Sequence, residues 1–458
     1  MSKRPRVLRS QRKIIDAIDS VNPHAAGIDA GSEEHVVSVP DDRPGQDSVR
    51  TFKTFTVDLH AMAGFLIERG ITTVAIEATG VYWIPLYEIL EERGLNPRLV
   101  DSRSIGRRTK KTDVLDCQWL RQLHMYGLLD PAFRPPADIL RLRAYRRQRD
   151  MLVGCASDHI RHIHKALDLM NVKLHLVVSD TVGVTGLRII RAIIDGKREP
   201  AALAALRERS CRASEQEFID ALIGNYRDEH LFALRQAVEL FDVYQAKIEA
   251  CDGETAKYMA TLEKRSDPKK PLPKKSQSRR KNQPYFDART MLNDMVGIDL
   301  TAIDGLESSS VLSILAETGI DMSPWSGAKS FAAWLALSPN DRITGGKPIR
   351  TKGRTIHPNR AAQAFRLGAQ TLEHAQCGLG AFFRRVRVRL GRRGAIKATA
   401  HKLAVIFYSM LKNRTEYHDP GIDYYEQRYR ENLLKSLTKK AQTLGYSLTA
   451  LQPVQEVH

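Results

Sequence analysis

Four carboxylates in the first 120 residues could share one site. Asp29 lies in the motif GIDAG at the end of an expected strand, where small neighbours leave its side chain open to a ligand. Glu77 directly follows an apolar run, and a charge placed there is costly unless something pairs with it. Asp113 and Asp116, in the motif KTDVLD, are three residues apart on an expected helix and share one face.

Carboxylates in this number point to metal chemistry. Taken singly, each fits a structural role, since an Asp at a strand end is usually a turn residue. Taken jointly they repel one another unless a cation lies near, and hard oxygen ligands select magnesium or manganese. Two such ions activate the attacking oxygen and stabilise the leaving one in phosphoryl transfer. We therefore predict Asp29, Glu77, Asp113 and Asp116 as catalytic residues and metal ligands.

The elements around these residues follow a mixed α/β pattern. Strands are expected at 25–29, 35–40, 49–57, 72–77 and 97–101, with helices at 58–69, 82–93 and 112–126. Three strands followed by helix–strand–helix–strand–helix is the element order of the RNase H fold. In that fold the first and fourth strands are neighbours, so their ends and the face of the following helix can converge.

The rest of the chain is expected to be mainly helical. The predicted parts are a basic tail (1–20), the RNase H-like catalytic domain (21–130), a helical or coiled-coil region (131–264), a basic linker (265–290), a second folded unit (291–412) and a charged tail (413–458). Apolar residues near a/d spacing between 231 and 248 predict a helical hairpin or short coiled coil. Packing within one domain and dimerisation fit this pattern equally.

The charge of the chain indicates a polyanionic partner. Its net charge is +18 and its pI is about 9.7, and basic side chains that neutralise phosphates release condensed counterions. No apolar run approaches the roughly 20 residues of a membrane span, so we expect no membrane contact. The five cysteines form no CxxC pair, which excludes a zinc ribbon or disulfide framework and fits the cytoplasm.

Two basic stretches are candidates for nucleic-acid contact. Five arginines within 138–149 cover most of a helix surface, and they are expected either to face phosphate or to be solvated. A Gly-rich basic loop at 339–359 could hold a scissile phosphate, because guanidinium groups bind phosphate bidentately. The predicted contacts are Arg146, Arg147, Arg342, Lys347, Arg350, Lys352, Arg354 and Arg360.

At these motifs the chain resembles the DEDD transposases of the bacterial IS110 group. GIDAG, AIEATG and KTDVLD are similar to motifs of the group's RuvC-like domain. MVGIDLTAIDGL, FAAWLALSPNDRITGGK and NRAAQAFRLGA resemble its C-terminal transposase domain. The resemblance implies a DNA recombinase that uses a serine nucleophile, a site shared between subunits, a bridge RNA that selects donor and target DNA, and a homo-oligomer, dimer or tetramer.

The chain departs from that pattern at the nucleophile. The position matching the serine is Thr344, before Gly345. A threonine hydroxyl can attack phosphorus, although its β-methyl adds crowding. Ser338, six residues earlier, is a less well placed substitute. The alternatives are a RuvC-like metal-dependent nuclease acting with water, a related invertase, or a catalytically decayed nucleic-acid-binding protein.

Overall fold

The computed structural model describes residues 20–41, 47–78, 80–100, 112–273, 282–338, 342–344, 347–349 and 359–449. It divides into two compact units, residues 1–134 and residues 135–458. Among the described helices, none has the length and apolar character needed to cross a membrane.

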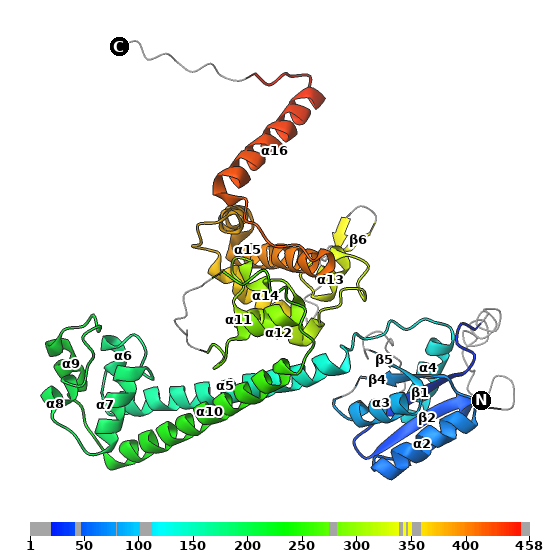
Figure 1. The fold of residues 1–458 in the computed structure, drawn as a ribbon, viewed down its shortest axis with the longest axis horizontal. Coiled ribbons are helices and arrows are strands. Elements are labelled where there is room, and N and C mark those ends of the chain that lie inside the picture. The colour runs from blue at the N-terminus through cyan, green and yellow to red at the C-terminus, as the bar shows by residue number, and fades with distance from the viewer. Residues whose placement is uncertain are drawn as a thin grey trace, which may run out of the picture. The chain divides into compact units, whose positions relative to one another are not determined.

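The first unit is a mixed five-stranded sheet with helices on both faces (Figure 1). Its strands are β1 (Ala25–Ala30), β2 (Glu34–Pro40), β3 (Asp47–Lys53), β4 (Thr73–Glu77) and β5 (Asn96–Val100), and its helices are α2 (Thr56–Glu68), α3 (Trp83–Glu92) and α4 (Asp113–Met125). The sheet order is β3-β2-β1-β4-β5. β2 pairs antiparallel with β1 and β3, whereas β1, β4 and β5 are parallel. The predicted element order and the pairing of the first and fourth strands are confirmed, and both are compatible with an RNase H-like domain.

One predicted boundary is wrong. The third strand was expected to reach residue 57, but β3 ends at Lys53 and α2 begins at Thr56. Phe55 is extended, and its carbonyl accepts the N–H groups of Asp58 and Leu59, which starts the helix. The β-branched residues before Asp58 favour a strand locally. Burial of the helical face that begins at Leu59 outweighs that preference.

The second unit begins with a long helical hairpin. Helices α5 (Ala137–Leu169) and α10 (Asp228–Ala260) run antiparallel, since Tyr258 donates a hydrogen bond to the Asp138 carbonyl and Arg149 pairs with Asp252. Four short helices lie between them along the chain, α6 (Leu174–Val177), α7 (Val184–Ile194), α8 (Pro200–Ala204) and α9 (Glu215–Leu222).

The apolar stripe of α10 is thereby explained within the chain. Leu234, Val238, Phe241 and Ile248 are buried in one cluster with residues of α5 and of the short helices. The predicted hairpin is confirmed. Packing within the unit, rather than dimerisation, accounts for these four residues.

A second group of helices completes this unit. It contains α11 (Ala288–Val296), the 3-10 turn η1 (Leu300–Ala302), α12 (Ser308–Thr318), α13 (Ala328–Trp334), α14 (Arg360–Thr371), α15 (Gly378–Asn413) and α16 (Gly421–Thr443). A two-stranded ribbon is formed by β6 (Arg342–Thr344) and β7 (Lys347–Ile349). Phe331, Phe365 and Phe407 are fully buried between α13, α14 and α15 and stack edge-on at the centre of this group.

Candidate active site

The two faces of the sheet have different partners. Ala26, Ile28 and Ala30 of β1 point into the core that α2 and α3 cover. Because side chains alternate along a strand, Gly27 and Asp29 point to the opposite face. On β4, Ala75 packs with Leu120 of α4, so Ala75 and Glu77 share the face of Gly27 and Asp29.

Asp29 is the next-to-last residue of β1 and Glu77 is the last residue of β4, and the two strands are parallel neighbours. The last paired residues of β1 and β4 are Ile28 and Ile76, and the two carboxylates come next in each strand. Adjacent strands lie about 4.8 Å apart, so the two side chains are neighbours on one face. Both are partly exposed, whereas Ile28 and Ile76 are fully buried.

Helix α4 approaches this face unusually closely at Gly27. A Cβ on Gly27 would lie 2.4 Å from the Cys117 carbonyl oxygen and 2.5 Å from the Arg121 nitrogen. Real Cβ atoms essentially never show such contacts, so only glycine lets the helix backbone rest on β1. Gly27 of the GIDAG motif therefore fixes the distance between α4 and β1, the strand that carries Asp29.

The direction of α4 brings its first turn to the carboxyl end of the sheet. Near its C-terminus, His124 bonds Thr73 at the start of β4, with 2.9 Å between Nε2 and Oγ1. Its middle meets Gly27. Helix α4 is therefore antiparallel to β1 and β4, and its N-terminus lies toward the ends of those strands.

The axial distances place Asp113 level with Asp29. Asp113 precedes Cys117 by four residues, about 6 Å along a helix axis. Asp29 follows Gly27 by two residues, about 7 Å along a strand. Thr112 caps the helix by accepting the Leu115 N–H, and the acids Asp113 and Asp116 lie in the first turn. Carboxylates there are also favoured by the helix dipole.

The four carboxylates lie toward the same end of the sheet, but the described residues do not bring them into one cluster. Asp113 is exposed and Asp116 is partly exposed. Among residues 20–449 as far as they are described, no three of the four bring their ligand atoms within 4.8 Å of one another.

Histidine 124 supports the far end of the same helix. Its ring is buried, and burial, with Arg98 adding to the effect, lowers the pKa of His124 below its ordinary value. The neutral ring bonds Thr73, while the His124 carbonyl accepts a hydrogen bond from the Asn22 side chain. These contacts hold α4 on β4 at the end away from the carboxylates.

The predicted nucleophile lies in the second unit. Thr344 ends β6 and pairs with Lys347 of β7, with Gly345 and Gly346 between them in the sequence. Arg342 begins the same ribbon. Arg350, Lys352 and Arg354 lie outside the described residues, so their predicted contacts stay predictions.

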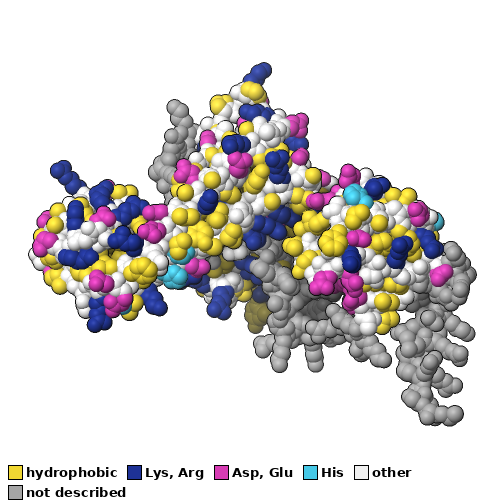
Figure 2. Space-filling view, turned by 90° about the horizontal axis from the view of Figure 1, so that it is seen from below, with side chains coloured by type: hydrophobic (Ala, Val, Ile, Leu, Met, Phe, Trp, Pro, Cys, Tyr) yellow, Lys and Arg dark blue, Asp and Glu magenta, His cyan; other side chains and the backbone are white. Residues whose placement is uncertain are grey.

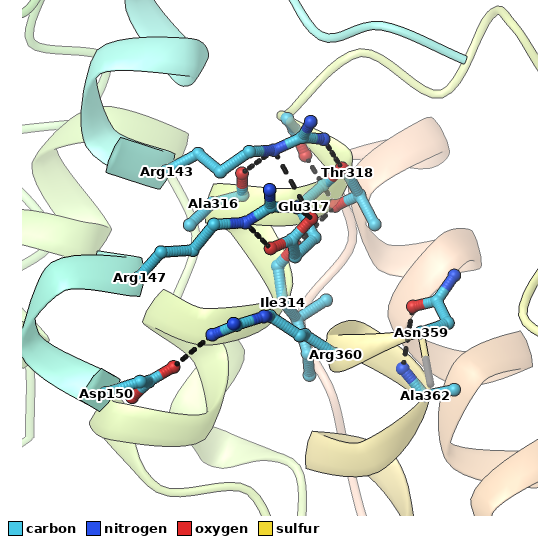
Figure 3. Close-up of polar contacts among 11 residues, drawn as sticks. Arg143, Arg147, Asp150, Ile314, Ala316, Glu317, Thr318, Asn359, Arg360 and Ala362 are labelled. Atoms are coloured by element: carbon cyan, nitrogen blue, oxygen red, sulfur yellow. Dashed lines mark hydrogen bonds and ion pairs between the residues drawn. The ribbon is translucent and has the colours of Figure 1, made fainter. Parts of the chain in front are cut away.

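The arginines of α5 bind protein groups in the second unit (Figure 3). Arg147 holds the Glu317 carboxylate through two hydrogen bonds of 3.0 and 2.9 Å. Arg143 donates to the carbonyl oxygens of Ala316 and Glu317 at the end of α12. Arg146 donates to the Ser313 hydroxyl at 2.9 Å. These residues join α5 to α12, an arrangement that neither sequence interpretation included.

Arg360 extends this network to α14. It is the first residue of α14, and its Nη1 lies 3.2 Å from Asp150 of α5, which also pairs with Arg146. Its side chain stays about half exposed at 45%. Lys and Arg side chains also recur among acidic ones over the visible surface (Figure 2). Contacts of Arg146, Arg147 and Arg360 with nucleic acid remain a prediction.

One group of ligand-type side chains was missed from the sequence. The ligand atoms of Asp304, Cys377 and Asp419 lie within 4.8 Å of one another. Asp419 accepts the Gly378 N–H with both oxygens, and the Cys377 sulfur accepts the Gly380 N–H. Burial raises the pKa of the Cys377 thiol. Asp419 and Cys377 therefore cap the N-terminus of α15, where the positive end of the helix dipole disfavours a cation.

Comparison with known proteins links the first unit and α5 to one family. Residues 26–172 match the DEDD transposase family of the IS110 group, described as a transposase. The match covers about a third of the chain and contains all four predicted carboxylates. No curated protein matches the chain. A transposase acts on DNA, so the match supports an enzyme of DNA transposition or recombination in general terms.

Proposed function

We propose that this chain is a DNA transposase of the IS110 type, with Asp29, Glu77, Asp113 and Asp116 as its metal-binding carboxylates. One observation carries this proposal. Asp29 and Glu77 follow the last paired residues of the neighbouring strands β1 and β4, and the first turn of α4, with Asp113 and Asp116, lies toward the same end of the sheet. The family match over the same residues supports it independently. On this basis the first unit is an RNase H-like, RuvC-like catalytic domain.

The donor set fits a hard divalent cation. All four groups are carboxylates, they come from three elements that meet at one sheet end, and each is at least partly exposed. Magnesium or manganese held there would supply charge neutralisation at a reacting phosphodiester. The chain's own part is placement, since burial of Ile28 and Ile76 fixes the two strand ends and Gly27 fixes the height of α4.

Thr344 is the proposed nucleophile. Its hydroxyl would attack the scissile phosphorus, forming a phosphothreonine ester and breaking the bond to the 3′ oxygen of the cut strand. The hydroxyl proton would pass to water, and the 3′ oxygen would take a proton from water and leave as a hydroxyl. The basic residues near it, including Arg342 and Lys347, would hold the phosphate. A bridge RNA that selects the DNA, and a site completed by a second subunit, belong to the same proposal.

The carboxylates are tested by neutral, isosteric variants. Asp29→Asn and Asp116→Asn should each lower magnesium-dependent cutting of a plasmid carrying the DNA that flanks the reading frame by at least about a hundredfold. Asp58→Asn is the matched control, because Asp58 is a first-turn acid of α2, outside the predicted carboxylate set. Full cutting by Asp29→Asn would refute the site.

The nucleophile is tested separately. Thr344→Ala should abolish strand joining and covalent protein–DNA adducts on denaturing gels, while Thr344→Ser should retain both. Unchanged cutting by Thr344→Ala without adducts would favour a RuvC-like nuclease that uses water. If the wild type binds nucleic acid but cuts no DNA, and the carboxylate variants change only its affinity, the decayed nucleic-acid-binding protein would be favoured.

A further inference from the structure

Helix α16 exposes large apolar side chains along one face, most of all in its C-terminal half. None of its side chains is buried, and Tyr429, Leu433, Leu437 and Leu444 are 41–74% exposed. Leaving large apolar groups in water is unfavourable by about 25 cal/mol for each Å². Most of the stability of a helix in a protein comes from packing of its apolar face, and no side chain of α16 is fully buried.

The contacts of α16 with α15 lie at its N-terminal end. The Tyr425 ring packs edge-on against Phe382, and the Arg385 guanidinium lies over the rings of Tyr425 and Tyr429. Toward its C-terminus the helix projects away from α15 (Figure 1). Its C-terminal half therefore presents its leucines to solvent.

The residues of the exposed face have a symmetric spacing. They follow one another at steps of 4, 3, 4, 4, 3 and 4 residues, and Leu433 is the middle one. Such steps keep side chains on one side of a helix with 3.6 residues per turn. The face consists of Ile422, Glu426, Tyr429, Leu433, Leu437 and Lys440 of α16, together with Leu444, which directly follows the helix as its C-cap.

We propose that α16 pairs antiparallel with α16 of a second copy of this chain, centred on Leu433. In that register Leu433 faces Leu433 of the second copy, Tyr429 faces Leu437, and Ile422 faces Leu444. Glu426 faces Lys440 of the second copy, so opposite charges meet at two symmetric places. The pattern reads the same from either end, which is what an antiparallel pair of identical helices needs.

Charge distinguishes this pairing from its parallel alternative. A parallel pair would set Glu426 against Glu426 and Lys440 against Lys440, and like charges at facing positions are destabilising. An antiparallel pair also places opposite ends of the two helix dipoles together. The same pairing would form whatever reaction the first unit catalyses.

Disulfide trapping in the full-length protein tests the register. Leu433→Cys should form a covalent dimer on mild oxidation, because the two residues face each other. Leu444→Cys is the matched control, since its two copies would be about 33 Å apart at a rise of 1.5 Å per residue. The yield is measured above that of the wild type, which has five cysteines of its own. Equal trapping at both positions, or none at Leu433→Cys, would overturn the proposal.

Charge reversal tests the partner. Glu426→Lys and Lys440→Glu, each combined with Leu433→Cys, should each lower the yield of covalent dimer about tenfold. Each substitution turns both facing pairs of opposite charge into pairs of like charge. The double variant Glu426→Lys/Lys440→Glu restores both pairs and should restore trapping. Failure of the double variant to recover would contradict pairing with an identical helix. Circular dichroism of each variant checks that the fold is unchanged.

Discussion

Replacing Gly27 by alanine should disable the carboxylate site without removing any carboxylate. The new Cβ would lie 2.4 Å from the Cys117 oxygen and 2.5 Å from the Arg121 nitrogen. Both are backbone atoms of α4, so no side-chain rotation relieves the clash. The helix must instead move away from β1, and Asp113 and Asp116 move with it.

The size of that movement follows from the contact distances. Ordinary van der Waals contact begins at 3.4 Å, so α4 must retreat by about 1 Å. Overpacking of this kind destabilises a fold by about 1–3 kcal/mol. A misplacement of about 1 Å at a catalytic group can lower the rate roughly a hundredfold. We therefore expect Gly27→Ala to stay folded but to lose about two orders of magnitude in metal-dependent DNA cutting.

Gly64→Ala provides the control for this experiment. Gly64 lies within α2, on the other side of the sheet, and a Cβ there meets nothing within 4 Å. Alanine inside a helix is favoured over glycine by about 0.5–1 kcal/mol. This variant should keep wild-type cutting and unfold at a slightly higher temperature. Cutting by Gly27→Ala within about threefold of the wild type would show that the close approach of α4 does not position the site.

Three further predictions concern stability. Asp252→Ala should lower the free energy of unfolding by about 3–5 kcal/mol in urea, because it leaves Arg149 charged and buried without the carboxylate 2.6 Å away; an effect below 1 kcal/mol would contradict this. Glu317→Gln should cost about 1.5–3 kcal/mol by weakening its bonds to Arg147, whereas exposed Glu229→Gln should be neutral. Burial lowers the pKa of His124 in the folded state, so its contribution to the free energy of unfolding should be full above about pH 6.5 and should fall as the pH drops below that value. His124→Gln should flatten this part of the plot of unfolding free energy against pH. An unchanged plot would argue against the buried neutral ring.

The strands of the sheet could be predicted because each depends on a short run of adjacent apolar residues. The apolar runs before Asp29 and Glu77 are strands in the structure, and the first and fourth strands are neighbours as predicted. Each strand end depends on a few adjacent residues that must be buried. From the sequence, Gly27 is recognisable only as a small neighbour of Asp29, because its contact with Cys117 and Arg121 spans about 90 residues of sequence. The spacing of apolar residues within a helix or strand carries no information about contacts between residues so far apart in the sequence.

The arginines of α5 show the opposite situation. Their number predicted either phosphate contact or solvation, but Arg147 binds Glu317, which lies 170 residues away. A guanidinium reaches acids, carbonyls and phosphates with the same geometry. Only tertiary packing decides among them. The stripe on α10 was ambiguous for the same reason, because the face that α5 offers is equivalent in pattern to that of a second subunit.

The placement of the carboxylates and their chemistry depend on different residues. Ile28, Ile76 and Gly27 fix where the strand ends and α4 meet, and none of them carries a charge. Asn in place of Asp29 removes a donor and should leave this packing intact. Ala in place of Gly27 retains every donor and alters only their spacing. If divalent-cation affinity depends on the number of carboxylates alone, the Gly27 variant will bind manganese as the wild type does. Loss of manganese binding in both variants would instead show that the ion requires the geometry that α4 and the sheet impose.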